Sequence, residues 1–301
     1  MTKILSFGAM NLDYVYGVNH FARAGESLAV NSFETYYGGK GLNQSIAIAR
    51  AGGIVHHAGV VGKDGMKLIE NLQANNVNTE AIRICDTPTG HAIIQCDPNG
   101  QNSILYYGGA NRCVRRDDID NVVRLFSARD YIVLQNEINL VGDIMKSAKN
   151  MGMKIVFNPS PYDKEIENLP LELADILVLN EVEAEELCGV TDDIKIMEDL
   201  RHRYPNGNFL LTKGEKGAVY QEKGSNEILY HGAYNVDAVD TTAAGDTFTG
   251  YFVSCLASGK PVSAALQIAS KAAAIAVSRT GASPSIPYMA EVLEAGLDIM
   301  E

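Results

Sequence analysis

Hydrophobic runs of strand length alternate with amphipathic segments in the second half of the chain. Four runs have the length of buried strands, at residues 131–134, 154–157, 176–179 and 209–212. Hydrophobic residues recur at helical spacing between them, at residues 140–151, 182–188 and, more weakly, 194–204. Such alternation requires crossover connections, which build a mostly parallel sheet with helices on both faces. The pattern therefore predicts an α/β fold.

The first third of the chain carries strand-like runs without helices between partners, at residues 14–18, 28–37, 91–95 and 103–107. Asp97-Pro98-Asn99-Gly100 is typical of a hairpin turn. These runs predict a small accessory sheet, formed by about residues 13–38 and 90–110, that stands off the main core. Its open face has two possible uses, to cover a pocket as a lid or to pair with another subunit.

The last third returns to helical patterns after a strand-like lead-in at residues 233–239. One helix is predicted from about residue 246 to 258, before Gly259, and an Ala-rich one from 261 to about 278, before Gly281. No repeat, low-complexity tract or long linker interrupts the sequence. We therefore expect a single α/β domain over residues 1–301.

Composition narrows the functional classes. Hydrophobic residues make up 46% and charged residues 21% of the 301 positions, the balance of a globular protein with a substantial core. A net charge of −12 argues against a nonspecific nucleic-acid partner. Apolar runs fall short of the roughly 20 residues of a membrane span, and the N-terminal run is too short for a signal peptide. Five cysteines without CxxC indicate neither a disulfide framework nor a zinc site. We expect a cytoplasmic protein without a membrane partner.

A loop of small residues leads into a predicted helix at residues 240–248, DTTAAGDTF. Ala243, Ala244 and Gly245 have little or no side chain, so their backbone N–H groups can approach an anion closely. The helix start adds partial positive charge. Phosphoryl transfer needs this environment because the moving group carries negative charge on its outer oxygens. The loop therefore predicts a phosphate-binding site.

Asp246 follows this loop, where its carboxylate could take the proton of an attacking hydroxyl. A helix cap is the commoner role for an aspartate at such a position, and this pattern alone favours it. Two further motifs favour the catalytic role of Asp246 over the helix cap. Residues 38–43, GGKGLN, let the backbone around Lys40 approach a ligand and place Asn43 in a first helical turn, although Gly-rich turns before helices are common. The sequence contains neither a Walker A loop nor GxGxxG.

The second of these motifs is Asn11-Leu12-Asp13, just after the first predicted strand. Polar residues at the carboxyl end of a strand lie where open α/β sheets bind ligands. Asn11 and Asp13 could bracket two adjacent hydroxyl groups. An Asx turn that ends the strand explains them equally well.

In this order, the motifs resemble the ribokinase (pfkB) family of carbohydrate kinases, and the resemblance covers essentially the whole chain. It also includes NPSP at 158–161, NEVE at 180–183 and TKGEKG at 212–217. The tail at 276–287, AVSRTGASPSIP, is similar to that of ribokinases within the family. The resemblance implies a three-layer sandwich with a mostly parallel central sheet between helices, plus a small β-sheet lid.

The resemblance also implies a role for each matching residue. Asp246 is the catalytic base, and the amides of Ala243, Ala244, Gly245 and Asp246 form an anion hole for the γ-phosphate. The positions that hold the sugar are Asn11, Asp13, Gly39, Lys40, Asn43, Glu137 and Asp246. The positions beside the nucleotide are Asn180, Thr212, Gly214, Gly217 and Gly245. Glu183 organises Mg²⁺ through water, and a monovalent cation, K⁺, lies near Asp240, Thr242, Ala276, Arg279, Gly281 and Ser285.

The implied function is ATP-dependent phosphorylation of a hydroxymethyl group, with D-ribose giving D-ribose 5-phosphate. Alternatives are a kinase for deoxyribose, fructose, a sugar acid or a nucleoside, and a non-catalytic sugar or nucleotide sensor. The expected partners are the sugar, ATP and a second copy of the chain, joined through the lid sheet. Three features depart from the family: Lys213 and Asn136 stand where apolar residues are usual, and the lid strands are rich in tyrosine, namely Tyr36, Tyr37, Tyr106 and Tyr107.

Overall fold

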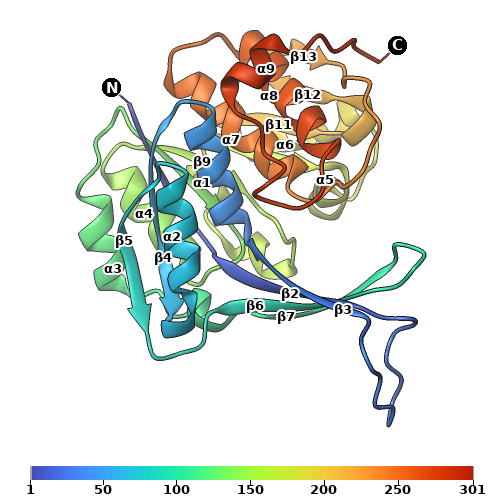
Figure 1. The fold of residues 1–301 in the computed structure, drawn as a ribbon. Helices are drawn as coiled ribbons and strands as arrows, with labels where there is room; N and C mark the ends of the chain where they lie inside the picture. Colours follow the sequence, from blue (N-terminus) through green and yellow to red (C-terminus); the bar gives the residue numbers. More distant parts are fainter. Residues whose placement is uncertain (1, 301) are drawn as a thin grey trace.

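The structure, a computed structural model, describes residues 2–300. In this part of the chain nine strands form a central sheet in the order β13-β12-β11-β10-β9-β8-β1-β4-β5 (Figure 1). All neighbours are parallel except the pairs β11–β12 and β12–β13. The strands are β1 (Lys3–Phe7), β4 (Ile54–Gly62), β5 (Asn78–Cys85), β8 (Tyr131–Gln135), β9 (Lys154–Asn158), β10 (Ile176–Asn180), β11 (Asn208–Thr212), β12 (Ala218–Gln221) and β13 (Ile228–His231). The four strands predicted in the second half are confirmed as β8 to β11.

Helices cover both faces of this sheet and complete a three-layer α/β sandwich. Helices α3 (Arg116–Val123), α4 (Val141–Asn150), α5 (Glu181–Cys188) and α6 (Asp193–Arg203) pack on one face. The other face is covered by α1 (Lys40–Arg50), α2 (Met66–Ala74), α7 (Ala244–Ala257), α8 (Val262–Val277) and α9 (Met289–Glu294). Strand β8 shows why its sequence is continuously hydrophobic: Ile132 packs in the first core and Val133 in the second. Short 3₁₀ turns occur at Lys63–Gly65, Gly109–Arg112, Lys164–Asn168, Leu171–Leu173 and Gly214–Lys216.

The accessory sheet is confirmed as a second, separate sheet. Within the described residues its four strands run in the order β3-β2-β6-β7, and Figure 1 shows it extending away from the body. Asp97 and Gly100 close the predicted hairpin turn, with the Gly100 N–H donating to the Asp97 carbonyl at 3.1 Å. The strands are β2 (Asn11–Gly17), β3 (Ser32–Gly38), β6 (Gly90–Cys96) and β7 (Asn102–Tyr107). The predicted start of β3 at residue 28 is four residues too early.

Two element predictions in the last third need correction. Residues 233–239 do not form a strand, because this segment meets the C-terminal tail in one isolated bridge, Tyr234 with Ile299. Helix α7 begins at Ala244, two residues before the predicted start. The predicted end of that helix is confirmed, since Gly259 follows it with a left-handed φ of 82°.

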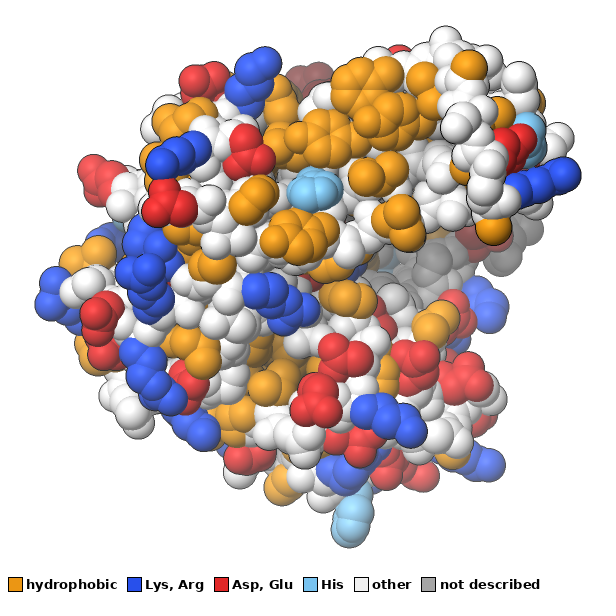
Figure 2. All heavy atoms as spheres, turned by 90° about the horizontal axis from the view of Figure 1, so that it is seen from below, with side chains coloured by type: hydrophobic (Ala, Val, Ile, Leu, Met, Phe, Trp, Pro, Cys, Tyr) orange, Lys and Arg blue, Asp and Glu red, His pale blue; other side chains and the backbone are white. Residues whose placement is uncertain are grey.

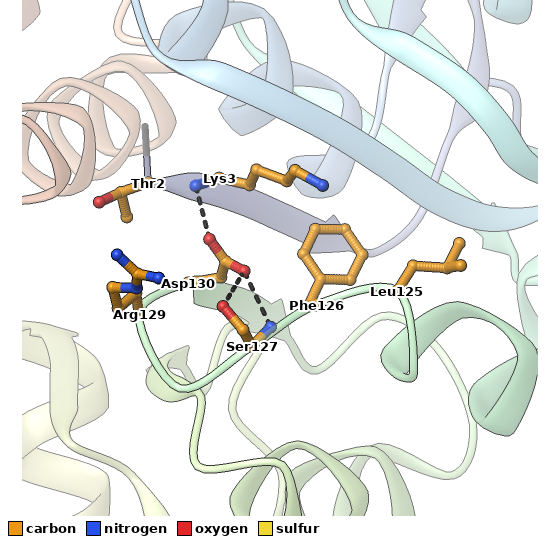
Figure 3. Close-up of a pocket in the computed structure, with 7 residues that line it drawn as sticks. All are labelled: Thr2, Lys3, Leu125, Phe126, Ser127, Arg129 and Asp130. Atoms are coloured by element: carbon orange, nitrogen blue, oxygen red, sulfur yellow. Dashed lines mark hydrogen bonds between the residues drawn. The ribbon is translucent and has the colours of Figure 1, made fainter.

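A cavity of about 390 Å³ lies at the amino ends of β1 and β8, lined by residues that include Lys3, Phe126 and Arg129 (Figure 3). The polar groups here already bond to one another. The Lys3 N–H donates to one Asp130 carboxylate oxygen at 2.8 Å, and the Ser127 N–H and hydroxyl donate to the other at 2.8 and 2.9 Å. We interpret these bonds as an anchor of the first strand, because they tie the Lys3 backbone to the turn before β8 (Figure 3).

No helix among residues 2–300 is long and apolar enough to cross a membrane.

Candidate active site

Helix α7 begins directly after the loop of small residues. Ala243 precedes it with a left-handed φ of 60° and accepts a hydrogen bond from the Thr247 N–H at 2.8 Å. Gly245 and Asp246 occupy the first turn, where helix N–H groups have no intrahelical acceptor. The Ala244 N–H instead donates to the Thr241 carbonyl at 3.2 Å, so this amide is already engaged, contrary to the expectation that it is open to an anion.

Asp246 is buried, with 8% of the residue exposed, and its carboxylate faces helix α1 rather than its own helix start. The Asn43 side-chain amide donates to Oδ2 at 3.0 Å, and the Gln44 side-chain amide donates to Oδ1 at 2.9 Å. Ala243, and not Asp246, occupies the cap position of α7. These contacts exclude the simple capping role and connect the GGKGLN segment to the acid.

Close packing of α1 against α7 makes these bonds possible. A Cβ atom on Gly250 would lie 2.4 Å from the Ala47 Cβ and 2.9 Å from the Gln44 carbonyl oxygen. Gly250 is one helical turn after Asp246, and Ala47 is one turn after Asn43, so both pairs face the same crossing. The absence of a side chain at residue 250 therefore brings the two helix starts within hydrogen-bond distance.

The candidate sugar residues gather between α1 and the accessory sheet. The Lys40 N–H donates to Glu137 Oε2 at 2.8 Å, which places the acid after β8 against the start of α1. Asn11 and Asp13 lie in β2, not in an Asx turn, and their register pairs Asn11 with Gly38 and Asp13 with Tyr36. A Cβ on Gly38 would lie 2.0 Å from Asp13 Oδ2, and Gly39 has a φ of 92°. The two glycines thus let the chain approach the acid and turn into the helix.

Burial makes the acids of this group harder to ionise. It raises the pKa of Asp13 to about 7 and that of Glu137 to about 7, although the Lys40 ammonium and N–H oppose the shift at Glu137. Burial alone would lower the pKa of Lys40, but the carboxylates of Asp246, Glu137 and Glu183 outweigh it and raise that pKa above its ordinary value. Lys40 is therefore a permanent cation between the two halves of the site.

A cleft of about 210 Å³ joins Lys40 and Asp246 to residues at the carboxyl ends of β9, β10 and β11. Ala243, Gly245, Asn180, Glu183 and Thr212 also line it. Strands of a parallel sheet end at a common edge, so residues more than 170 positions apart meet here. Part of the predicted phosphate and nucleotide set thus shares one cleft with Glu183 and the predicted base, whereas Ala244, Gly214 and Gly217 do not line it.

Asn180 and Glu183 form a capping box at the start of α5. The Glu183 N–H donates to Asn180 Oδ1 at 2.8 Å, and Glu183 Oε2 accepts from the Asn180 N–H at 3.0 Å. Glu183 is 4% exposed, so it is not the exposed helix acid that such a position usually carries. Its second carboxylate oxygen remains to bond a water of hydrated Mg²⁺, which fits an ion that keeps its waters.

Thr212 ends β11, and Gly214 and Gly217 lie in the loop between β11 and β12. Both glycines have left-handed φ values, 52° and 86°, and a Cβ on Gly217 would lie 2.0 Å from the His231 carbonyl oxygen. Lys213 forms an ion pair with Asp193 of α6, so its charge is turned away from this loop. Similarly, the Asn136 side-chain amide donates to the Pro161 carbonyl at 2.9 Å. The two polar departures thus have local structural partners.

Asp240 is hydrogen-bonded to two of the candidate monovalent-cation residues. Its carboxylate accepts from the Thr242 N–H at 2.8 Å and from the Gly281 N–H at 2.9 Å, which ties the loop before α7 to the segment after α8. Burial opposes ionisation, but these N–H groups and the Thr242 side chain lower the pKa of Asp240. Ala276 and Ser285 are buried, and the Arg279 side chain forms an ion pair with Glu291 at 2.7 Å. This set fits a cation held by oxygen atoms.

Three polar residues at the site were not predicted from sequence. Gln44 and Gln135 lie behind Asp246, and Asn111 joins the accessory sheet to the body. The Asn111 amide donates to Asn11 Oδ1 at 2.7 Å and accepts from the Met10 N–H at 3.1 Å. Gln44 stands beside the motif residue Asn43 and Gln135 ends β8, and these positions are the sequence signal that could have revealed them. Asn111 carries no such signal, because it lies in the 3₁₀ turn after β7.

Comparisons with known proteins agree with this geometry. The model of the pfkB family carbohydrate kinases matches residues 1–289. A ribokinase of Staphylococcus aureus is 35% identical over 301 residues, 96% of this chain and 98% of that protein. The structure of Arabidopsis thaliana ribokinase complexed with ribose and ATP has a TM-score of 0.89 at 29% identity and 98% coverage of both chains. The ribokinase of Cryptococcus neoformans var. grubii in complex with ADP has a TM-score of 0.88 at 30% identity, covering 98% of this chain and 99% of that one.

The helix crossing generates a prediction for stability. Gly250→Ala should lower the free energy of unfolding by about 1–3 kcal/mol, because the added methyl group overlaps α1. An alanine normally stabilises a helix interior relative to glycine, so the sign itself is informative. Urea unfolding measures the change. Ala47→Gly in the same chain should restore part of the loss by vacating space, whereas Gly296→Ala, with open space around its Cβ, is the neutral control. A stabilised Gly250→Ala protein would contradict the packing argument.

Proposed function

Because this chain belongs to the pfkB family of carbohydrate kinases, phosphotransferases with an alcohol acceptor, we propose that it transfers the γ-phosphoryl group of ATP to the 5-hydroxyl of D-ribose. One observation carries the proposal. Asp246 stands at the start of a helix that opens with small residues, and its carboxylate is hydrogen-bonded to Asn43 of the candidate sugar loop. A proton acceptor, an anion site and a hydroxyl-binding group therefore meet at one point.

The proposed reaction follows from these positions. Asn11, Asp13, Gly39, Lys40, Asn43 and Glu137 hold the sugar so that its hydroxymethyl group faces Asp246. Asp246 accepts the hydroxyl proton as the oxygen attacks, late in a loose transition state. The backbone amides of Ala243, Gly245 and Asp246 receive the charge that develops on the γ-phosphoryl oxygens. The Ala244 amide joins them if its turn with Thr241 opens on phosphate binding.

The nucleotide lies along the carboxyl ends of β10 and β11 in this proposal, beside Asn180, Thr212, Gly214 and Gly217. Mg²⁺, held through water by Glu183 and Asn180, would neutralise phosphate charge. Among the described residues no group of three or more His, Cys, Asp or Glu is placed to hold a metal. Asp240, Thr242, Ala276, Arg279, Gly281 and Ser285 would hold K⁺, whose charge would strengthen the neighbouring anion site.

We further propose that residues 1–301 act as one domain in the cytoplasm and that the accessory sheet is its lid. Residues that lie directly across from each other on paired strands point to the same face of the sheet. Register therefore places Tyr36 and Tyr106 on the face of Asp13, toward the candidate sugar site. Tyr37 and Tyr107 lie on the other face. Two phenols over the sugar are the reason to test deoxyribose, fructose, sugar acids and nucleosides beside ribose.

The function is tested by ADP release across this panel, with Mg²⁺ and K⁺ omitted in turn. D-ribose should give the highest kcat/KM, and omission of Mg²⁺ should abolish release. Asp246→Asn should bind sugar but lower kcat by roughly 10²- to 10⁴-fold, because the amide cannot accept the proton. Asp120→Asn, an exposed acid of α3, is the matched control. Near-normal turnover of Asp246→Asn would reject the assigned base, and binding without ADP release from any substrate would favour the sensor.

The two raised carboxyl pKa values predict how sugar affinity depends on pH. Sugar hydroxyls donate to ionised carboxylates, and a group with a pKa of about 7 is mostly protonated at pH 6 and mostly ionised at pH 8. The KM for the sugar should therefore fall as pH rises, by about tenfold for each carboxyl over this interval. Asp13→Asn should remove its share of the slope and leave that of Glu137. A pH-independent KM in the unaltered protein would contradict the role of both acids.

The outer face of the lid supports our proposal of a homodimer. Figure 2 views the molecule from the side on which this sheet lies in Figure 1 and shows a broad band of hydrophobic side chains. Phe33, Leu105 and Tyr107 are 53%, 65% and 48% exposed, and register puts them on the face opposite Asp13. Phe33 also packs against Tyr16 with ring centroids 4.9 Å apart. An apolar surface of this kind on a solvent-facing sheet favours a protein partner.

Light scattering at micromolar concentration should give twice the chain mass of 32.5 kDa. Phe33→Lys with Leu105→Lys should shift the protein to a monomer, because charged side chains would be buried without partners in the interface. Leu125→Lys, which alters an equally exposed leucine remote from the lid, should leave the dimer intact. A monomeric unaltered protein would overturn this proposal.

A further inference from the structure

We infer that Gln44 and Gln135 form a relay of side-chain amides that positions the Asp246 carboxylate for proton transfer. The inference rests on the proposed role of Asp246 as the base. According to this inference, two residues outside the predicted site orient the carboxylate that accepts the proton. Neither glutamine lines the cleft, so both act through Asp246 and are positioning residues.

The relay is a continuous line of hydrogen bonds inside the protein. The Gln135 amide Nε2 donates to Gln44 Oε1 at 2.6 Å, and the Gln44 amide Nε2 donates to Asp246 Oδ1 at 2.9 Å. Gln44 and Gln135 are both 0% exposed. Both amides donate toward the acid, so the Gln44 end of the relay presents an N–H group to the carboxylate.

Asn43 completes the restraint from the other side. Its amide donates to Asp246 Oδ2 at 3.0 Å, so each carboxylate oxygen receives one N–H. Two donors on two different oxygens fix both the position and the rotation of the carboxylate plane. Such orientation matters because proton transfer needs the acceptor lone pair to face the attacking hydroxyl.

The burial of these amides is not explained by core stability alone. Among residues 2–300, Gln135 Oε1 and Asn43 Oδ1 are buried without a hydrogen-bond partner. A buried acceptor left unpaired costs stability, and apolar side chains of similar size would avoid that cost. The Gln135 amide instead donates to Gln44, and the Asn43 amide donates directly to Asp246, so both help to hold the acid, which points to a catalytic benefit.

The relay starts at the end of β8, close to the residue that contacts the candidate sugar-binding loop. Gln135 is the last residue of β8, and Glu137 two positions later accepts from the Lys40 N–H at 2.8 Å. Space for the Gln135 side chain comes from Gly8, where a Cβ would lie 2.2 Å from Gln135 Oε1. The carboxyl end of one central strand thus supports both the start of α1 and the acid on α7.

The test compares Gln44→Met, Gln135→Met and the double variant, because methionine keeps the length of glutamine and removes its donor. Gln44→Met should lower kcat by roughly 10- to 100-fold, the effect of a displaced catalytic group, with KM for sugar and ATP within about twofold of the unaltered protein. Gln135→Met should have a smaller effect. The double variant should be no slower than Gln44→Met, because Gln135 reaches Asp246 through Gln44. Gln73→Met, an exposed glutamine of α2, is the matched control.

Crystal structures of the variants provide a readout that does not depend on activity. The Asp246 carboxylate should rotate away from its present bond with Asn43 in Gln44→Met and remain in place in Gln73→Met. An unmoved carboxylate would overturn the relay, as would kcat losses that multiply in the double variant or a KM that rises with the fall in kcat. If Gln44→Met does not fold, Gln135→Met carries the same structural test. Lack of kinase activity in the unaltered protein would instead refute the proposed function, while the position of the carboxylate would still decide the relay.

Discussion

Two helices that meet almost without side chains between them, at Gly250 of α7 and Ala47 of α1, hold the halves of the candidate site together. One turn before this contact, α7 carries Asp246 and α1 carries Asn43, and the two bond at 3.0 Å. The loop that precedes each helix then faces the same cleft, one with small residues for an anion and one with glycines for a hydroxylated ligand. Close packing of the two helices sets the distance between the Asp246 carboxylate and the Asn43 amide.

The acidic side chains of this cleft lie around one lysine, Lys40. Asp13, Glu137 and Asp246 would repel one another in a buried pocket, and burial already makes ionisation of Asp13 and Glu137 unfavourable. Burial would lower the pKa of Lys40, but the carboxylates of Asp246, Glu137 and Glu183 raise it. At the far end of the cleft Glu183 is fixed by its own helix start, so its carboxylate cannot turn toward Lys40 without losing the Asn180 N–H. The arrangement places the Lys40 ammonium between the candidate sugar and phosphate residues, where an anionic group would travel.

The sequence predicted the parts of this molecule that depend on local pattern. Strands β8 to β11 were recognisable because both faces are covered, which makes their sequences continuously hydrophobic. The DTTAAGDTF and GGKGLN segments indicated their chemistry because small residues at helix starts have few other uses. Residues 233–239 were wrongly predicted as a strand, since their partner is a distant tail and not a sheet neighbour. Other features depend on contacts that a single sequence does not reveal, namely the Ala244 turn, Asn111 and the two glutamines. Gln135 and Gln44, for example, are bonded although they are 91 positions apart.

Strand β2 serves two surfaces at once. Its odd-numbered residues from Asn11 to Val15 face the candidate sugar site, while Tyr14 and Tyr16 face the outer apolar side. Because side chains alternate along a strand, inserting or deleting one residue here would exchange the two sets. Such length changes in β2 would present aromatic rings to the sugar and an acid to the outer face. Substitutions in β2 can therefore change either surface separately, whereas an insertion or deletion of an odd number of residues changes both surfaces together.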